Sequence, residues 1–166
     1  GLTISGGTYT GSSGAADVNG VLTLSSGVLT APSGTLTIDG NWAQTGGTFT
    51  HNSGTVTFDK TSGTQTFNSG GSTFNNISHS QAGTLQLLTN GLTNVGTFTN
   101  SAGTFDTNGL AVTSTGLVTV SGGTYTASTA TQTFNGGLTI SGGTYTGSSG
   151  TADVNGALTI SSGTFT

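Results

Sequence analysis

Few side chains in this chain could carry out acid–base or nucleophilic chemistry. Its 166 residues contain five Asp, two His and no Cys, and the only cationic side chain is Lys60. Glycoside hydrolysis needs two carboxylates that flank the scissile bond, and lyase chemistry needs a base helped by a cation or a metal ion. His51 and His79 lie far apart in the sequence, and we expect both to be polar surface residues. We therefore predict no catalytic residues and a chain that is not an enzyme.

One set of polar residues recurs at a spacing of twenty. Its members are Asn19, Asp39, Asp59, Asn135 and Asn155, and all but Asp59 are followed by glycine. Asn and Asp tolerate the left-handed conformation of tight corners, so the first interpretation is a ladder of corner residues whose side chains hydrogen-bond from turn to turn. The second is a calcium site at Asp39 and Asp59, whose carboxylates would lie roughly 5 Å apart if stacked. Lys60 could neutralise the pair instead, and we predict no other cofactor.

A second set consists of threonine pairs with one aromatic residue between them. In a strand the aromatic ring would point inward and both hydroxyls outward. The pairs are Thr8 and Thr10, Thr48 and Thr50, Thr124 and Thr126, Thr144 and Thr146, and Thr164 and Thr166. Such rows resemble the flat faces of ice-binding proteins, whereas threonine also suits any solvated strand. Both interpretations stay open, although Val28 interrupts the first row.

Composition excludes several classes of protein. The net charge is −4 and there is no basic patch, so we expect no nucleic-acid partner. No apolar span of about twenty residues is present, so we expect no membrane insertion in this segment. Only 30% of the residues are hydrophobic and 4% are charged, which indicates a thin, elongated core with a hydroxyl- and amide-covered surface.

Apolar residues recur with a period of twenty. Leu2, Ile4 and Tyr9 correspond to Leu22, Leu24 and Leu29, and within each period they form alternating triplets such as LTI, TYT and ADV. Alternation indicates strands with one buried face, and glycine-rich segments such as residues 5–7 suit tight corners. A coil stacks each residue over the one twenty positions later, whereas an antiparallel meander would give that period no cause. We predict an all-β fold, a right-handed parallel β-helix (β-solenoid) with about 20 residues and three short strands per turn.

The same pattern restarts late in the chain. Residues 1–14 and 137–150 are identical, so residues 1–136 form a long repeat within a single solenoid array that covers residues 1–166. We expect that repeat to contain a whole number of turns, and we favour seven over six. Over residues 61–96 the register slips, which predicts either one swollen turn or, as seven turns would require, two lean ones. The absence of polar caps predicts that the array belongs to a longer chain.

Three segments carry a family resemblance. They are GLTISGGTYT (1–10), GNWAQTGGTFTHNSGTVTFD (40–59) and GTQTFNSGGSTFNNIS (63–78). They resemble the repeats of large bacterial surface proteins, the adhesin-like and filamentous-haemagglutinin-like parallel β-solenoids. The resemblance implies an extracellular or cell-surface location and carries over no functional residue.

The expected function is structural. We expect a stalk, fibre or filament-forming segment of an exported surface protein, which associates end to end or laterally through its strands. The partner on a surface, or a glycan ligand, is not identified by the sequence. The alternatives are a Thr-rich ice-binding or adhesive surface and, less favoured, a carbohydrate-active β-helix enzyme.

Overall fold

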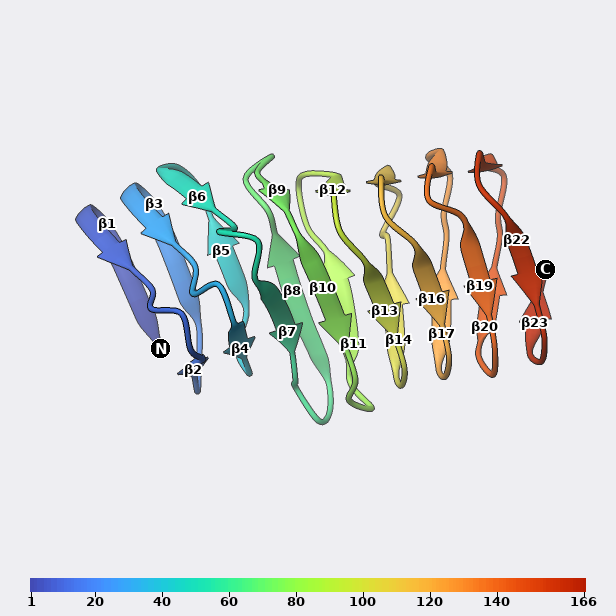
Figure 1. The fold of residues 1–166 in the computed structure, drawn as a ribbon, viewed down its shortest axis with the longest axis horizontal. Coiled ribbons are helices and arrows are strands. Elements are labelled where there is room, and N and C mark those ends of the chain that lie inside the picture. The colour runs from blue at the N-terminus through green and yellow to red at the C-terminus, as the bar shows by residue number, and fades with distance from the viewer.

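A computed structural model describes all residues from Gly1 to Thr166. The chain contains strands and no helix, and it winds into a parallel β-solenoid of about eight turns. The first turn lies at one end of the rod and the last at the other (Figure 1). The predicted fold class is confirmed, while the right hand of the coil stays a prediction.

Three parallel sheets form the walls of the coil. Sheet A contains β1 (Leu2–Thr10), β3 (Leu22–Thr30), β5 (Trp42–Gln44), β6 (Thr48–Thr50), β8 (Thr64–Asn68), β11 (Thr84–Leu87), β14 (Thr104–Asp106), β17 (Thr124–Thr126), β20 (Thr144–Thr146) and β23 (Thr164–Phe165). Sheet B contains β2 (Ala16–Val18), β4 (Thr35–Ile38), β7 (Thr55–Phe58), β10 (Asn76–His79), β13 (Phe98–Asn100), β16 (Val118–Val120), β19 (Leu138–Ile140) and β22 (Leu158–Ile160). Sheet C contains β9 (Thr73–Phe74), β12 (Leu92–Asn94), β15 (Val112–Ser114), β18 (Gln132–Phe134) and β21 (Ala152–Val154). From the fourth turn (β8, β9 and β10) onward, each complete turn crosses all three walls.

The twenty-residue period is the stacking distance of the coil. Leu22 pairs with Leu2 on one side and with Trp42 on the other, and Tyr145 pairs in the same way with Tyr125 and Phe165. Successive strands run in the same direction because the chain returns to each wall only after a complete circuit. Most strands inside the rod therefore have both edges hydrogen-bonded and offer no free edge to another chain. The exceptions are β6, which pairs only with β3, and β9, which pairs only with β12.

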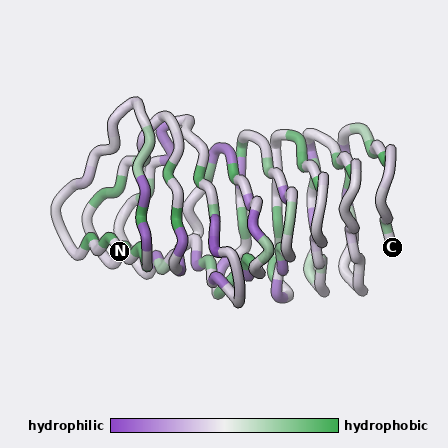
Figure 2. The backbone as a smooth tube through the Cα atoms, turned by 90° about the horizontal axis from the view of Figure 1, so that it is seen from below, coloured by the Kyte–Doolittle hydropathy of each residue, from purple (hydrophilic) through white to green (hydrophobic).

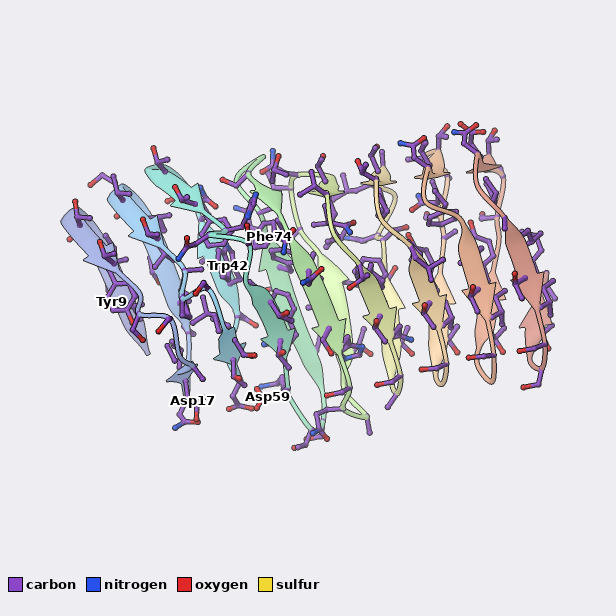
Figure 3. The ribbon with its side chains drawn as sticks, viewed as in Figure 1. Tyr9, Asp17, Trp42, Asp59 and Phe74 are labelled. Atoms are coloured by element: carbon purple, nitrogen blue, oxygen red, sulfur yellow. The ribbon has the colours of Figure 1, made fainter.

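The core is a thin column of apolar side chains along the rod. It comprises 29 buried residues, and apolar positions recur from coil to coil along the tube in Figure 2. Aromatic rings fill its middle: Trp42 lies 4.9 Å from Phe49 and 5.1 Å from Phe74 between ring centroids, edge to face, and Figure 3 shows Trp42 and Phe74 side by side. Edge-to-face contacts are a favourable geometry for such rings, so this cluster stabilises the third and fourth turns.

The slipped region consists of two turns, as expected, but they are not lean. In sheet B, Val56 pairs with Ile77 and Ile77 with Phe98, so each step is one residue longer than the twenty seen elsewhere. In sheet A the slip is concentrated in one step, where Trp42 pairs with Phe67. The extra residues form the long connection 59–63 between β7 and β8, which protrudes at the lower edge of the rod in Figure 1.

Amide side chains replace the backbone ladder at the slip. Nε2 of Gln65 donates to the carbonyl oxygens of Ile38 and Gly40 at 2.7 and 2.6 Å. Oδ1 of Asn41 accepts from the backbone N–H of Thr66 at 2.9 Å. These bonds satisfy backbone groups that the five-residue displacement removes from regular pairing.

The two identical copies occupy different walls. Leu2, Thr3 and Ile4 begin a sheet A strand in the first turn, whereas Leu138, Thr139 and Ile140 form β19 of sheet B in the seventh. The copies are thus six turns and two walls apart, one third of a turn short of seven. The expectation of a whole number of turns is wrong, because one apolar triplet can replace another on any wall.

The predicted corner at residues 5–7 is also absent. There the backbone continues through a nine-residue strand, β1, bent at Gly7 with φ of +70°, while the identical residues 141–143 form a corner between β19 and β20. Pairing of Ser5 with Ser26 on β3 keeps this segment extended. The conformation of the segment therefore depends on the turn stacked against it.

Candidate functional site

The predicted corner ladder is divided between two corners. Asn19, Asp39 and Asp59 follow strands of sheet B, whereas Asn135 and Asn155 follow strands of sheet C. In the second group, Nδ2 of Asn155 donates to Oδ1 of Asn135 at 3.0 Å, which is the turn-to-turn amide bond of the first interpretation. The five residues therefore do not form one continuous ladder.

The carboxylates of the first group affect one another. Burial raises the pKa of Asp59, and the negative charges of Asp39 and Asp17 raise it further. Asp17 and Asp59 lie along the same lower edge of the rod in Figure 3. No three acidic or histidine side chains come close enough to share a metal ion, so calcium at Asp39 and Asp59 stays a prediction.

The threonine pairs lie on two walls. Thr8, Thr10, Thr48 and Thr50 are exposed on β1 and β6, and the next strand beyond β6 is β9 of sheet C. Thr124, Thr126, Thr144 and Thr146 are half-buried on β17 and β20 of sheet A. The structure therefore does not bring the eight residues together on one face.

Other hydroxyl columns are longer than the predicted rows. One column of sheet A comprises Thr64, Thr84, Thr104, Thr124, Thr144 and Thr164. A column of sheet B comprises Thr37, Thr57, Ser78, Thr99, Thr119, Thr139 and Thr159. In the neighbouring column of sheet A, Gln86 and Asp106 stand in place of threonine, and their side chains hydrogen-bond to each other at 2.8 Å. Hydroxyl groups thus cover more than one wall.

The two histidines differ. His51 is partly exposed, and its Nδ1 accepts from the backbone N–H of Ser53 at 3.0 Å. His79 is 1% exposed, and its Nδ1 lies 2.7 Å from Oδ1 of Asn100. The expectation that His79 is a surface residue is wrong. Ile77 and His79 are two residues apart on β10, so their side chains lie on the same, inward-facing side of the strand. Asn100, one turn away, is the partner of His79.

Burial of His79 predicts a pH-dependent stability. Burial lowers the pKa of His79 below its ordinary value of 6.5, so the unfolded chain binds a proton that the folded chain does not. The stability is full above pH 6.5, and we expect it to fall as the pH decreases through that value, by at most about 1.4 kcal/mol per pH unit. Urea unfolding at a series of pH values measures the effect, and His79→Gln, which does not titrate, serves as the control. Equal pH dependence of the two proteins over this range would contradict the assignment.

The buried tyrosines are structural. Tyr125 and Tyr145 stack with ring centroids 5.3 Å apart, and the hydroxyl of Tyr125 donates to Oε1 of Gln132 at 2.9 Å. Burial raises the pKa of Tyr145 to about 12 and that of Tyr125 well above its ordinary value of 10. Both side chains therefore stay protonated at neutral pH.

A polar cavity opens where the register slips. It has a volume of about 410 Å³ and lies at three stacked corners: residues 45–47 between β5 and β6, residues 69–72 between β8 and β9, and residues 88–91 between β11 and β12. Its lining comprises the amide side chains Gln44, Asn68 and Asn90, the hydroxyl side chains Thr45 and Thr89, and three glycines. No lining residue is hydrophobic and none carries a charge.

Two residues of this cavity have unusual environments. Gln44 is 2% exposed; its Nε2 donates to Oγ of Ser72 at 2.8 Å, whereas its Oε1 has no hydrogen-bond partner. Gly70 makes room for it, because a Cβ there would lie closer than 3.0 Å to the Gln44 side chain. Thr89 has φ of +73°, a strained conformation for a β-branched residue, and such strain clusters at functional sites.

The sequence does not predict this cavity. Two signals pointed to the region: Gln44 stands where neighbouring turns have apolar residues, and the period fails over residues 61–96. Neither signal places residues 45, 68 and 89 together, since their separations of 23 and 21 differ from the regular period. The cavity follows from the changed register of the strands around it.

Comparisons with protein-family models, with curated proteins and with solved structures find no match to this chain. The structure contains no helix that is both long enough and apolar enough to cross a membrane.

Proposed function

We propose that this chain is a rod-forming structural segment of an exported surface protein, where it acts as a stalk, a fibre or an adhesive surface. The observation that carries the proposal is the continuous stack: sheets A and B run through all the turns, and the apolar core has no break between them. In such a stack each turn is stabilised by its neighbours, so length can increase without a larger globular core.

The surface and the end faces suit this role. Hydroxyl columns on sheets A and B cover the rod with groups that interact well with water without carrying charge. Leu158, Ile160 and Phe165 of the last turn are 48%, 49% and 37% exposed, and they form an apolar face at that end of the rod. A further turn of the same chain and the first turn of a second copy are both suitable occupants, which is the basis for proposing end-to-end association.

The alternatives have less support. An ice-binding face needs a flat, regular array of hydroxyls. The paired threonine array on sheet A is regular only over β17, β20 and the start of β23. On the preceding strands β14 and β11, Asp106 and Gln86 take the place of the second threonine. An enzyme needs converging acid–base groups, and the polar cavity has neither carboxylate nor imidazole in its lining. An adhesive surface is compatible with the rod and forms part of the proposal.

A tandem chain tests the rod. In it, residues 1–136 occur twice before residues 137–166, so that each junction repeats the natural one. Because the long repeat spans six turns and two walls, the rod should lengthen by roughly 30 Å at a spacing of about 4.8 Å per turn. Small-angle scattering measures the length and the cross-section of the particle separately. In addition, we expect the second copy of the repeat to be rotated by one third of a turn relative to the first.

The 166-residue chain is the control for cross-section and for association. An unchanged cross-section in a longer particle supports the rod, whereas a wider particle of unchanged length contradicts it. Electron micrographs of the same samples report association, for which end-to-end filaments are expected. Isolated short rods at every concentration would contradict self-association and leave the stalk as the proposed role.

A further inference from the structure

We propose that the polar cavity at residues 44–47, 68–70 and 89–90 is a binding site for a neutral sugar. The inference goes beyond the rod and does not depend on it, since a cavity at three corners binds its ligand whether the chain is a stalk or not. Its volume of about 410 Å³ falls in the range of small-molecule sites, roughly 300–1,000 Å³.

The chemistry of the lining indicates a polar, uncharged ligand. Small-molecule sites are ordinarily lined by apolar side chains, whereas here none is present, so an apolar ligand would gain little from leaving water. An anion would need a cationic partner, but Lys60, the only cationic side chain, is not in the lining. A divalent cation would need carboxylates, and the lining has none.

The donor and acceptor pattern favours a sugar among neutral ligands. Amides and hydroxyls present donors and acceptors together, which matches a sugar hydroxyl because each one donates and accepts a hydrogen bond. Oε1 of Gln44 is an unpaired acceptor, and Nδ2 of Asn68 is a donor on a side chain whose Oδ1 accepts from the N–H of Gly70 at 3.3 Å. An extended peptide is less suitable, since it would need a free strand edge, and β5 and β8, which carry Gln44 and Asn68, are each paired with a strand on both sides.

The local backbone accounts for the position of the site. In sheet A only Trp42 and Ala43 of β5 pair with β8, so Gln44 is paired with Leu24 on β3 but has no ladder partner on the β8 side. The next two corners along the rod, residues 69–72 and 88–91, have four residues each, whereas residues 45–47 are three, and Thr89 lies in the second of these with φ of +73°. The strained Thr89 conformation is explained if its hydroxyl contributes to the site, because strain is kept where the surrounding structure uses it.

Titration of the ¹⁵N-labelled chain tests the proposal. The probes are the methyl glycosides of glucose, galactose, mannose and N-acetylglucosamine, with glucuronate and inorganic phosphate as charged probes. We expect saturable shifts of the amide signals of Gly46, Gly47, Gly70 and Asn90 with at least one neutral glycoside. The double variant Thr45→Val/Asn90→Leu keeps the side-chain sizes close and should weaken that binding by about tenfold or more.

The control variant is Thr115→Val, an exposed corner threonine on the other side of sheet C, which should leave the affinity unchanged. Spectra of both variants without ligand establish that each one folds. Binding of phosphate or glucuronate alone would overturn the assignment in favour of an anion site. Absence of saturable shifts with all four neutral glycosides, or equal affinity of the double variant and the native chain, would also overturn it.

Discussion

Gly116→Ala is expected to destabilise the solenoid by roughly 1–3 kcal/mol, the range for overpacking that forces a backbone to move. Gly116 lies in the corner between β15 and β16, stacked directly over Gly96. A Cβ at this position would lie closer than 3.0 Å to the carbonyl carbon and oxygen of Gly96. The added methyl group cannot rotate away, because both obstructing atoms belong to the backbone, so the two turns must separate.

Gly14→Ala is the matched control. Gly14 is also a corner glycine, but a Cβ there would have only Oγ of Ser12 within 4 Å, at an ordinary contact distance of 3.7 Å. Its φ is not in the left-handed region, so alanine should be neutral or slightly stabilising, by up to about 1 kcal/mol, through the restricted unfolded chain. Urea unfolding followed by circular dichroism compares the two. Equal stability of both variants would show that the corners do not stack as closely as described.

Phe67→Ala is expected to destabilise the fold by about 3–5 kcal/mol, the range for removing a buried aromatic ring. The ring of Phe67 is fully buried, with centroids 4.6 Å from Phe58, 5.0 Å from Phe74 and 6.0 Å from Trp42. It lies at the register slip, where only two residue pairs join β5 to β8. A cavity there should weaken the interface between the third and fourth turns more than it weakens the packing within either turn.

Trp42, the single tryptophan, provides the measurement, because it is buried against Phe67 and reports on this interface by fluorescence. Leu88→Ala is the control: the N–H of Leu88 donates to the carbonyl of Phe67 at 2.9 Å, but its side chain is 42% exposed. Its truncation should change the stability by less than about 1 kcal/mol. If fluorescence and circular dichroism give separate transitions only in Phe67→Ala, the two ends of the rod have become uncoupled. Similar losses in both variants would contradict the central role of the Phe67 ring.

Several local features were predictable from the sequence. The pairings of Leu2 with Leu22, of Phe105 with Tyr125 and of Tyr145 with Phe165 follow directly from the twenty-residue period. Alternation within each triplet identified most of the core, since neighbouring side chains on a strand point to opposite faces. The same alternation would have placed His79 inside with Ile77, and the surface assignment failed because it rested on residue type alone.

The candidate sites were predictable only in part. The amide bond between Asn135 and Asn155 matches the first interpretation of the corner residues, but none of the five has the left-handed conformation that this interpretation assumed. The cavity was not foreseen, because its lining comes from three turns whose registers differ. A polar residue at a core position, Gln44, was its only direct signal, and that signal does not say which residues surround it.

The sequence by itself determined that this chain coils, that strands stack about twenty residues apart and which side chains point inward, because these properties depend on local alternation and on the repeat length. Only the tertiary structure decided on which wall each triplet lies. The triplet LTI lies in sheet A at Leu2 and in sheet B at Leu138, so the wall on which it lies depends on the turn stacked against it. The long connection 59–63 changes the register between the third and fourth turns, and the polar cavity lies where the register changes.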